Sequence, residues 1–188
     1  MPFIDHFDLI APLYERLFSS PNSEKLFSFL NLPLDGSLLD AGGGTGRIVQ
    51  SLNDKVPTIV VVDLSMGMLR VASKKDGIYP VCSQVEALPF ISGTFDRIIM
   101  VDAFHHVCDQ SETAEELWRM LKPGGRLVIE EPDVQNFSVK LIAIFEKIAL
   151  MRSHFLSPGQ IENLFKRVNA NIYIERDGVS AWVIVEKG

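Results

Sequence analysis

The stretch LLDAGGGTGR, residues Leu38–Arg47, carries the pattern that decides the fold. The segment Ser37–Asp40 is typical of a buried strand, and four glycines follow it within five residues. Because glycine has no Cβ atom, such a backbone turns sharply and approaches a ligand closely. Residues Ile48–Leu52 then predict the body of a helix, whose first amides are placed to hold an anionic group. We therefore expect a strand, a glycine turn and a helix beside a ligand.

The rest of the chain alternates predicted strands with predicted helices. Apolar and β-branched runs predict four further strands, at Thr58–Val62, Ile78–Cys82, Phe95–Val101 and Arg126–Glu130. Strands that alternate with helices imply a parallel sheet. Two more strands, Asn171–Glu175 and Ala181–Val185, flank the hairpin signal Asp177-Gly178. We expect an α/β fold with a doubly wound, mostly parallel seven-stranded sheet, the last strand antiparallel, and three α/β/α layers.

Capping signals mark several of the helices. Ser65 is a predicted N-cap, and Asp109 and Glu112 have capping-box spacing before a helix that ends at Leu121. The run Ser157–Gln160 combines a capping box with proline at the first helical position. Apolar spacing also predicts an amphipathic N-terminal helix, which Pro12 kinks or divides, and a second helix at Ser23–Leu30.

The 188 residues suit one compact domain, 1–188. Its N-terminal helices, within residues 1–31, are candidates for a lid, and residues 134–157 for an insertion on the substrate side. The helix predicted at Phe137–Met151 is apolar around nearly its whole circumference, so it needs cover on more than one side. The sheet with the N-terminal helices, a second subunit, or an apolar substrate tail or membrane surface would each supply that cover.

Composition excludes several classes of protein. The net charge of -6 disfavours binding to nucleic acid. No export signal is evident, and Phe137–Met151 is shorter than the ~20 apolar residues of a membrane-spanning helix, so no transmembrane segment is expected. Cys82 and Cys108 are too few for a disulfide framework and too far apart for a CxxC motif. We expect a cytoplasmic protein with two inert, packed thiols.

The glycine turn and an aspartate after the next strand together predict an adenosine-type cofactor. Asp63 follows Gly42 by 21 residues and ends the second predicted strand, where it is placed to accept hydrogen bonds from both ribose hydroxyls. A dinucleotide fingerprint, GxGxxG, would have a third glycine at the position of Arg47. This departure favours S-adenosylmethionine over a dinucleotide.

The pattern Asp40-x-Gly42-x-Gly44-x-Gly46 resembles motif I of the class I S-adenosylmethionine-dependent methyltransferases. The resemblance covers nearly the whole chain and includes ordered matches at Asp63, Glu86–Phe90, Phe95-Asp96, His105–Val107 and Leu121–Arg126. The opening FDLIAPLYERL further resembles the ubiquinone/menaquinone-biosynthesis branch of that superfamily.

The resemblance implies a set of cofactor-binding residues. Gly42 and Gly44 would approach the methionine part of S-adenosylmethionine, Asp63 the ribose and Leu64 the adenine face. Gln84 and Val85 would lie at the adenine edge, although related sequences often have Asp at the position of Gln84. Three further residues complete this predicted site: Asp40 and Gly46 from motif I, and Tyr14, which would reach over the cofactor if the first helix folds back.

Two histidines are candidates for catalysis. His105 and His106 follow the fourth predicted strand, at the edge where the cofactor binds, and imidazole titrates near neutrality. We expect only one to face the site, and the alternative is that the pair packs the loop and shapes the pocket. His154 is expected at the surface. No metal site is predicted.

Four acids also lie near the ends of the fourth and fifth strands, and together they would make the pocket acidic: Asp102, Glu130, Glu131 and Asp133. Taken singly, each is expected to be a solvated or capping carboxylate.

The sequence thus predicts methyl transfer to a small molecule, with a lipophilic quinone-type acceptor as a candidate. An NAD(P)-dependent oxidoreductase and a non-catalytic S-adenosylmethionine-binding partner protein are the alternatives. Carbon, oxygen or nitrogen methylation stays open, as do peripheral membrane contact and the choice between monomer and homodimer.

Overall fold

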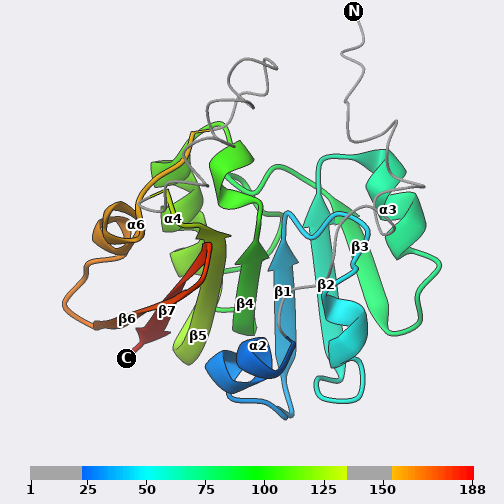
Figure 1. Cartoon of the computed structure of the whole chain (residues 1–188). Helices are drawn as coiled ribbons and strands as arrows, with labels where there is room; N and C mark the ends of the chain where they lie inside the picture. The colour runs from blue at the N-terminus through cyan, green and yellow to red at the C-terminus, as the bar shows by residue number, and fades with distance from the viewer. Residues whose placement is uncertain (1–22, 135–153) are drawn as a thin grey trace, which may run out of the picture.

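The computed structural model describes residues 23–134 and 154–188, which form a seven-stranded sheet flanked by helices (Figure 1). The strands are β1 (Ser37–Ala41), β2 (Thr58–Asp63), β3 (Ile78–Cys82), β4 (Phe95–Val101), β5 (Leu121–Pro132), β6 (Ala170–Asp177) and β7 (Ser180–Lys187). Their order is β3-β2-β1-β4-β5-β7-β6. The first five strands pair in parallel, whereas β7 is antiparallel to both β5 and β6. The predicted sheet is confirmed.

Helices cover both faces of the sheet. They are α2 (Ser23–Leu30), α3 (Met66–Ala72), α4 (Gln110–Met120), α6 (Pro158–Leu164) and the 3-10 helices η1 (Val49–Leu52) and η2 (Phe104–His106). Buried side chains of α4, α6 and η2 pack on one face, and those of α2, η1 and α3 pack on the other. The three predicted layers are therefore present.

The predicted caps of three helices are also present. The Ser65 hydroxyl accepts a hydrogen bond from the Met68 amide at 3.1 Å, which starts α3. Asp109 accepts from the amides of residues 111 and 112 at the start of α4. Ser157 and Gln160 form the capping box of α6, with Pro158 in its first turn. Local sequence therefore determines where these helices begin.

Two elements differ from the sequence prediction. The helix after the glycine turn is η1, a four-residue 3-10 helix, so no long helix opens toward the ligand site. Strand β5 begins at Leu121, whereas the predicted strand begins at Arg126. The intervening glycine Gly124 has φ +74°, and the pairing register with β4 shifts between Phe95 and Arg97. Residues 122–125 thus end α4 as predicted and also form an irregular first part of β5.

Helix α2 lies toward the amino edge of the sheet, below β4 and β5 in Figure 1. Arg97 Nε donates to the Leu30 carbonyl at 2.5 Å, and Arg126 Nη1 donates to the Phe29 carbonyl at 2.7 Å. This part of the predicted lid is therefore away from the carboxyl edge. The first predicted helix and the apolar helix Phe137–Met151 lie outside the described residues.

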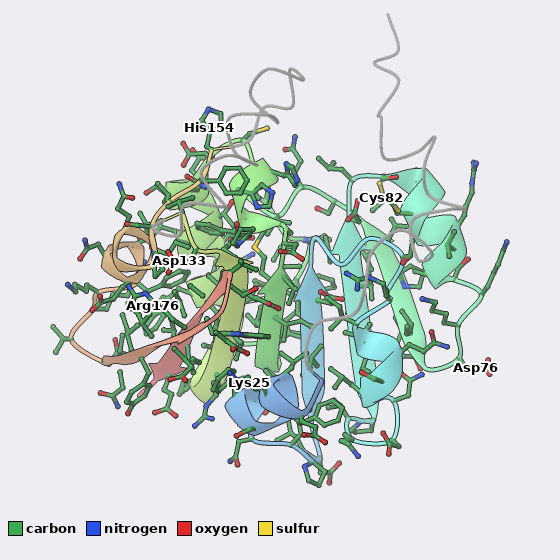
Figure 2. The ribbon with its side chains drawn as sticks, viewed as in Figure 1. Lys25, Asp76, Cys82, Asp133, His154 and Arg176 are labelled. Atoms are coloured by element: carbon green, nitrogen blue, oxygen red, sulfur yellow. The ribbon has the colours of Figure 1, made fainter. Side chains whose placement is uncertain are left out.

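The order of the strands reverses at β1, which lies between β2 and β4. In doubly wound sheets, ligands bind at the carboxyl ends of the strands beside such a reversal. Figure 2 shows Cys82 and His154 at this edge and Lys25 and Asp76 at the opposite one. The glycine turn lies at the ligand-binding edge because it follows β1 directly.

Candidate active site

The glycine turn folds over the end of β2. Gly42, Gly44 and Gly46 have φ values of +71°, +55° and +67°, a region that side chains disfavour. The amides of Gly42 and Gly43 both donate to the Val62 carbonyl, at 2.8 and 3.1 Å. The turn is thereby attached to β2 as well as to β1.

The three positive-φ glycines have different surroundings. A Cβ on Gly42 would lie 2.8 Å from the Cβ of Ala103, and one on Gly46 would lie 3.1 Å from Ile78 Cδ1. A Cβ on Gly44 would meet nothing closer than the Asp63 carboxylate at 3.9 Å. Gly44 therefore borders open space, whereas Gly46 allows the turn to pack on the sheet.

Gly43 is a residue that the sequence analysis missed. A Cβ there would lie 2.4 Å from the Asp40 carboxylate, so only glycine fits. Asp40 is 1% exposed, and neither of its carboxylate oxygens has a hydrogen-bond partner among the described residues. Burial, and next the charge of Asp63, raise the pKa of Asp40 to about 7. The Asp40 carboxylate thus packs against the turn at Gly43. The run of small residues Ala41–Gly44 is the sequence signal that could have identified Gly43.

Asp63, at the end of β2, is held in place by two backbone amides. Its Oδ2 accepts from Gly44 N at 2.9 Å, and its Oδ1 accepts from Ser65 N at 2.8 Å. The carboxylate is therefore oriented by the turn after β1 and by the residue that caps α3.

A pocket of about 280 Å³ opens beside these residues at the carboxyl edge. Its walls come from the glycine turn, the β2 end, the loop after β3 and the turn after β4: Gly42, Gly44, Asp63, Leu64, Met68, Ser83, Val85, Glu86, Met100, Asp102, Ala103, His106, Val107 and Cys108. Five residues predicted to bind the cofactor are among them: Gly42, Gly44, Asp63, Leu64 and Val85. Asp40, Gly46 and Gln84 are not. Tyr14 lies outside the described residues.

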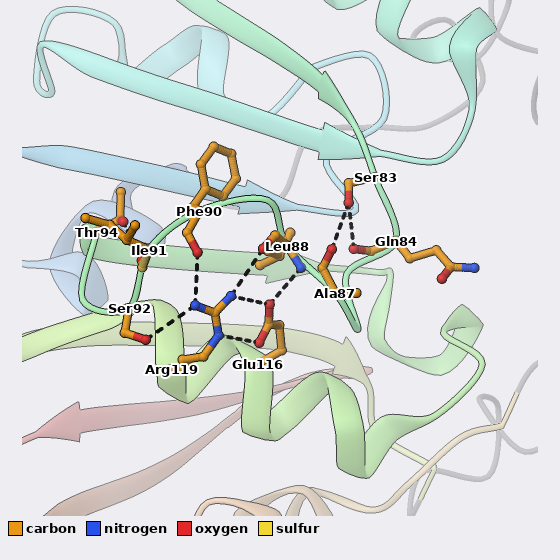
Figure 3. Close-up of polar contacts among 10 residues, drawn as sticks. All are labelled: Ser83, Gln84, Ala87, Leu88, Phe90, Ile91, Ser92, Thr94, Glu116 and Arg119. Atoms are coloured by element: carbon orange, nitrogen blue, oxygen red, sulfur yellow. Dashed lines mark hydrogen bonds and ion pairs between the residues drawn. The ribbon is translucent and has the colours of Figure 1, made fainter.

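The loop after β3 is fixed by α4 (Figure 3). Arg119 donates to the carbonyls of Leu88 and Phe90, and Glu116 accepts from the Leu88 amide at 2.7 Å. The Gln84 side chain is exposed, and its amide points away from this network in Figure 3. The sequence resemblance placed Gln84 at the adenine edge, but its side chain is not part of the pocket wall.

The two histidines have separate environments. His105 is 4% exposed, and its Nδ1 lies 2.6 Å from Glu131 Oε2. His106 lines the pocket, with its ring centroid 3.9 Å from that of His105. Burial, and next the positive charge of His105, lower the pKa of His106 to about 4. One histidine faces the pocket, as expected, and it is His106. His154 is exposed, as expected.

The four acids near the ends of β4 and β5 were each expected to be a solvated or capping carboxylate, and the structure exposes one and buries three. Only Asp102 is exposed, and it lines the pocket with φ +50°. Glu130, Glu131 and Asp133 are buried. Burial, and next the charge of Asp102, raise the pKa of Glu130 to about 7. Asp133 accepts from Arg176 Nε at 3.1 Å; both residues are labelled in Figure 2. Glu131 accepts from a backbone amide and Asp133 pairs with Arg176, whereas Glu130 Oε2 is buried without a hydrogen-bond partner among the described residues.

The prediction of two packed thiols is wrong. Cys82 and Cys108 are both exposed, and Cys108 lines the pocket. Cys82 is the last residue of β3, and Cys108 lies in the loop between η2 and α4, so both side chains reach the open edge instead of the core.

The charged side chains that line the pocket are all acidic: Asp63, Glu86 and Asp102. Within residues 23–134 and 154–188, no group of three His, Cys, Asp or Glu side chains is arranged to hold a metal ion. No helix in the same ranges has the length and apolar character needed to cross a membrane. The acidic lining favours a cationic ligand over an anionic one.

Comparison with known proteins agrees with this geometry. Residues 39–129 match the family model described as a methyltransferase domain. A relative from Geotalea uraniireducens (strain Rf4) is 30% identical over 186 residues, which cover 89% of this chain and 76% of the relative. The chain belongs to the class I S-adenosylmethionine-dependent methyltransferases, and S-adenosylmethionine is its cofactor. That relative is the ubiquinone/menaquinone biosynthesis C-methyltransferase UbiE.

Solved structures share the fold at low identity. A methyltransferase from Thermotoga maritima has a TM-score of 0.76 at 22% identity and covers 97% of this chain and 98% of its own. The geranyl diphosphate C-methyltransferase from Streptomyces coelicolor A3(2), in complex with S-adenosyl-L-homocysteine, has a TM-score of 0.71 at 17% identity and covers 88% and 76%. These two likenesses show the fold alone.

Proposed function

We propose that this methyltransferase acts on a small quinol-type ring and methylates a ring carbon. The observation that carries this proposal is the similarity to a quinone-biosynthesis C-methyltransferase over most of both chains. The composition of the pocket agrees with it, because Met100, Ala103 and Val107 supply apolar wall for a planar ring.

The glycine turn and Asp63 are the proposed donor site. S-adenosylmethionine supplies a methyl group that its positive sulfur already activates. Gly44 leaves room at the turn, and the oriented Asp63 carboxylate accepts from the ribose hydroxyls. Leu64 and Val85 contact the adenine. We leave the Gln84 side chain out of this site because it is exposed and outside the pocket wall.

The charges around the pocket suit a cationic donor. Asp63, Glu86 and Asp102 attract positive charge, and no Lys or Arg is among the lining residues of the described chain. His106 is neutral at pH 7 because its pKa is about 4. A protonated imidazole in the same wall would repel the donor. The low pKa therefore removes an unfavourable interaction.

His106 is the proposed proton acceptor. A ring that gains a methyl group at carbon becomes a strong carbon acid until it loses the proton from that carbon. A weak neutral base suffices for such a proton, whereas an un-ionised alcohol requires a stronger base. The low pKa of His106 thus favours an activated ring carbon over an alcohol oxygen as the methylated atom.

A direct test uses a panel of acceptors with S-adenosylmethionine. Reduced benzoquinols and naphthoquinols, with and without prenyl tails, and primary amines are incubated with the protein, and products are read by mass spectrometry. We expect a gain of one methyl group on a quinol, with NMR locating it on a ring carbon. Methylation of the amines alone would reject the proposed acceptor and keep the methyltransferase activity.

A further inference from the structure

A single buried carboxylate organises the turn after β4. Glu131, on β5, is 4% exposed. Its Oε1 accepts from the amides of Ala103 and Phe104, at 3.1 and 2.8 Å, and its Oε2 lies 2.6 Å from His105 Nδ1. Three consecutive residues of the turn therefore depend on one side chain from the neighbouring strand.

The same turn makes contact with the glycine turn. Ala103 lies against Gly42, where an added Cβ would be only 2.8 Å from the Ala103 Cβ. Ala103 and His106 both line the pocket. A small displacement of Ala103 would therefore change the wall opposite the glycines. Glu131 itself is not a lining residue, so its influence on the pocket is indirect.

His105 also joins the turn to the segment that begins at His154. The His105 ring stacks on Phe155, with centroids 4.3 Å apart and planes 14° apart. The His154 amide donates to the His105 carbonyl at 2.8 Å, and Gln110 Nε2 bridges the carbonyls of Phe104 and His154. His105 is thus occupied in holding two segments together.

We propose that Glu131 is a positioning residue, which holds Ala103 and His106 in the pocket wall through the turn amides and His105. In this arrangement His105 is a structural partner and His106 is the imidazole that meets ligands. The inference rests on the proposed function only in that the pocket holds the methyl donor.

The contact between Glu131 and His105 also bears on the pKa of His106. Glu131 Oε2 lies 2.6 Å from His105 Nδ1, and the charge of His105, after burial, lowers the pKa of His106. The other titratable groups that share the pocket wall with His106 are Asp63, Glu86, Asp102 and Cys108. Removal of the Glu131 charge should therefore raise the pKa of His106 toward its ordinary value.

Two substitutions separate the two roles of Glu131. Glu131→Gln keeps an oxygen for the amides of Ala103 and Phe104 but presents an uncharged amide to His105. Glu131→Leu removes both interactions. Asp133→Asn is the matched control, because Asp133 is another buried carboxylate at the end of β5 and is paired with Arg176 instead of the turn.

The readouts are the imidazole NMR titration of the free protein and calorimetric binding of S-adenosylhomocysteine. We expect Glu131→Gln to raise the pKa of His106 by about 0.5 or more and to keep binding within about threefold. Glu131→Leu should weaken binding by about tenfold or more, as expected when buried donors lose their acceptor. Asp133→Asn should change neither quantity. Circular dichroism establishes that each variant is folded.

An unchanged His106 titration in folded Glu131→Gln, or full binding by folded Glu131→Leu, would overturn the proposal. Failure of the wild-type protein to bind S-adenosylhomocysteine would instead reject the proposed donor site. The titration distinguishes these failures because it needs no ligand.

Discussion

The Asp63 carboxylate accepts a hydrogen bond from the Gly44 amide at 2.9 Å, which joins the end of β2 to the turn that follows β1. The two features that predicted an adenosine-type ligand are therefore one physical unit. The turn orients the carboxylate, and the carboxylate limits movement of the turn. A change to either partner should affect the other.

Replacement of Asp63 by Ala should weaken S-adenosylhomocysteine binding. The loss removes charge-assisted bonding to the ribose, and one such bond is worth about 1.5–3 kcal/mol. We expect a decrease in affinity of roughly 10- to 100-fold by calorimetry. Asp76→Ala is the control, since Asp76 is exposed at the opposite edge of the sheet (Figure 2). Equal affinity for the Asp63 variant and the control would contradict this role.

Replacement of Gly44 by Ala should affect both stability and binding. A side chain at φ +55° costs about 1–2 kcal/mol, and the new methyl group enters the open side of the turn. Gly124→Ala is a matched control because Gly124 has φ +74° and a Cβ there meets no atom within 4 Å. Both variants should lose similar stability in urea unfolding, but only Gly44→Ala should lose affinity for S-adenosylhomocysteine. Parallel loss of affinity in both would mean that strain alone explains the effect.

Replacement of Asp40 by Asn should change the pH dependence of stability. The pKa of Asp40 is raised from 3.8 to about 7 by burial, so the folded protein holds this proton more tightly than the unfolded chain. The associated stability is complete below about pH 4 and is lost as pH rises through 7. The full shift corresponds to roughly 4 kcal/mol.

The Asn side chain does not ionise, so the free energy of unfolding of the variant should lack the decrease with rising pH that Asp40 causes. Urea unfolding at several pH values between 4.5 and 8 measures the difference in unfolding free energy between wild type and variant. We expect that difference to shift in favour of the variant as pH rises. A difference that does not vary with pH would show that Asp40 stays ionised in the folded protein. Glu130, also raised to about 7, gives the wild type a second contribution of the same sign, which cancels in the comparison.

The sequence predicted the sheet because local signals and long-range packing agree in this fold. The apolar runs of β1 and β2 are buried on both faces, and the caps at Ser65, Asp109 and Ser157 are satisfied within a few residues of the chain. The glycine turn and Asp63 were predictable for the same reason. Both are set by their positions at the ends of adjacent strands.

The parts that were not predictable depend on how side chains are oriented in the folded chain. Glu131 differs from Glu130 only by pointing to the opposite face of β5, and only the fold shows that this face meets His105. Likewise, the need for glycine at position 43 arises from the orientation of the Asp40 carboxylate below it. The exposure of Gln84 depends on how its loop leaves β3.

Replacement of His106 by Gln should slow methyl transfer about 100-fold or more, a typical contribution of a positioned base. Binding of S-adenosylhomocysteine should stay within about threefold, because the imidazole is neutral. The exposed His154 serves as control, and His154→Gln should keep the wild-type rate. Steady-state rates with an active quinol from the acceptor panel measure both variants.

The pH profile of the wild type gives an independent check on His106. Since its pKa is lowered to about 4, the neutral form predominates throughout the range from pH 5.5 to 8. The rate should therefore stay level on the acid side of neutrality and fall only near pH 4. An acid limb centred near pH 6.5, absent in His106→Gln, would show that His106 titrates normally.

The most direct test of the donor site is isothermal titration calorimetry of the wild type and the Asp63→Ala variant with S-adenosylhomocysteine and, separately, NAD. We predict one site per chain for S-adenosylhomocysteine, a much weaker interaction in the variant, and no heat of binding with NAD. No binding of S-adenosylhomocysteine by folded wild-type protein, or equal binding by both proteins, would contradict the assignment of Asp63 and the glycine turn.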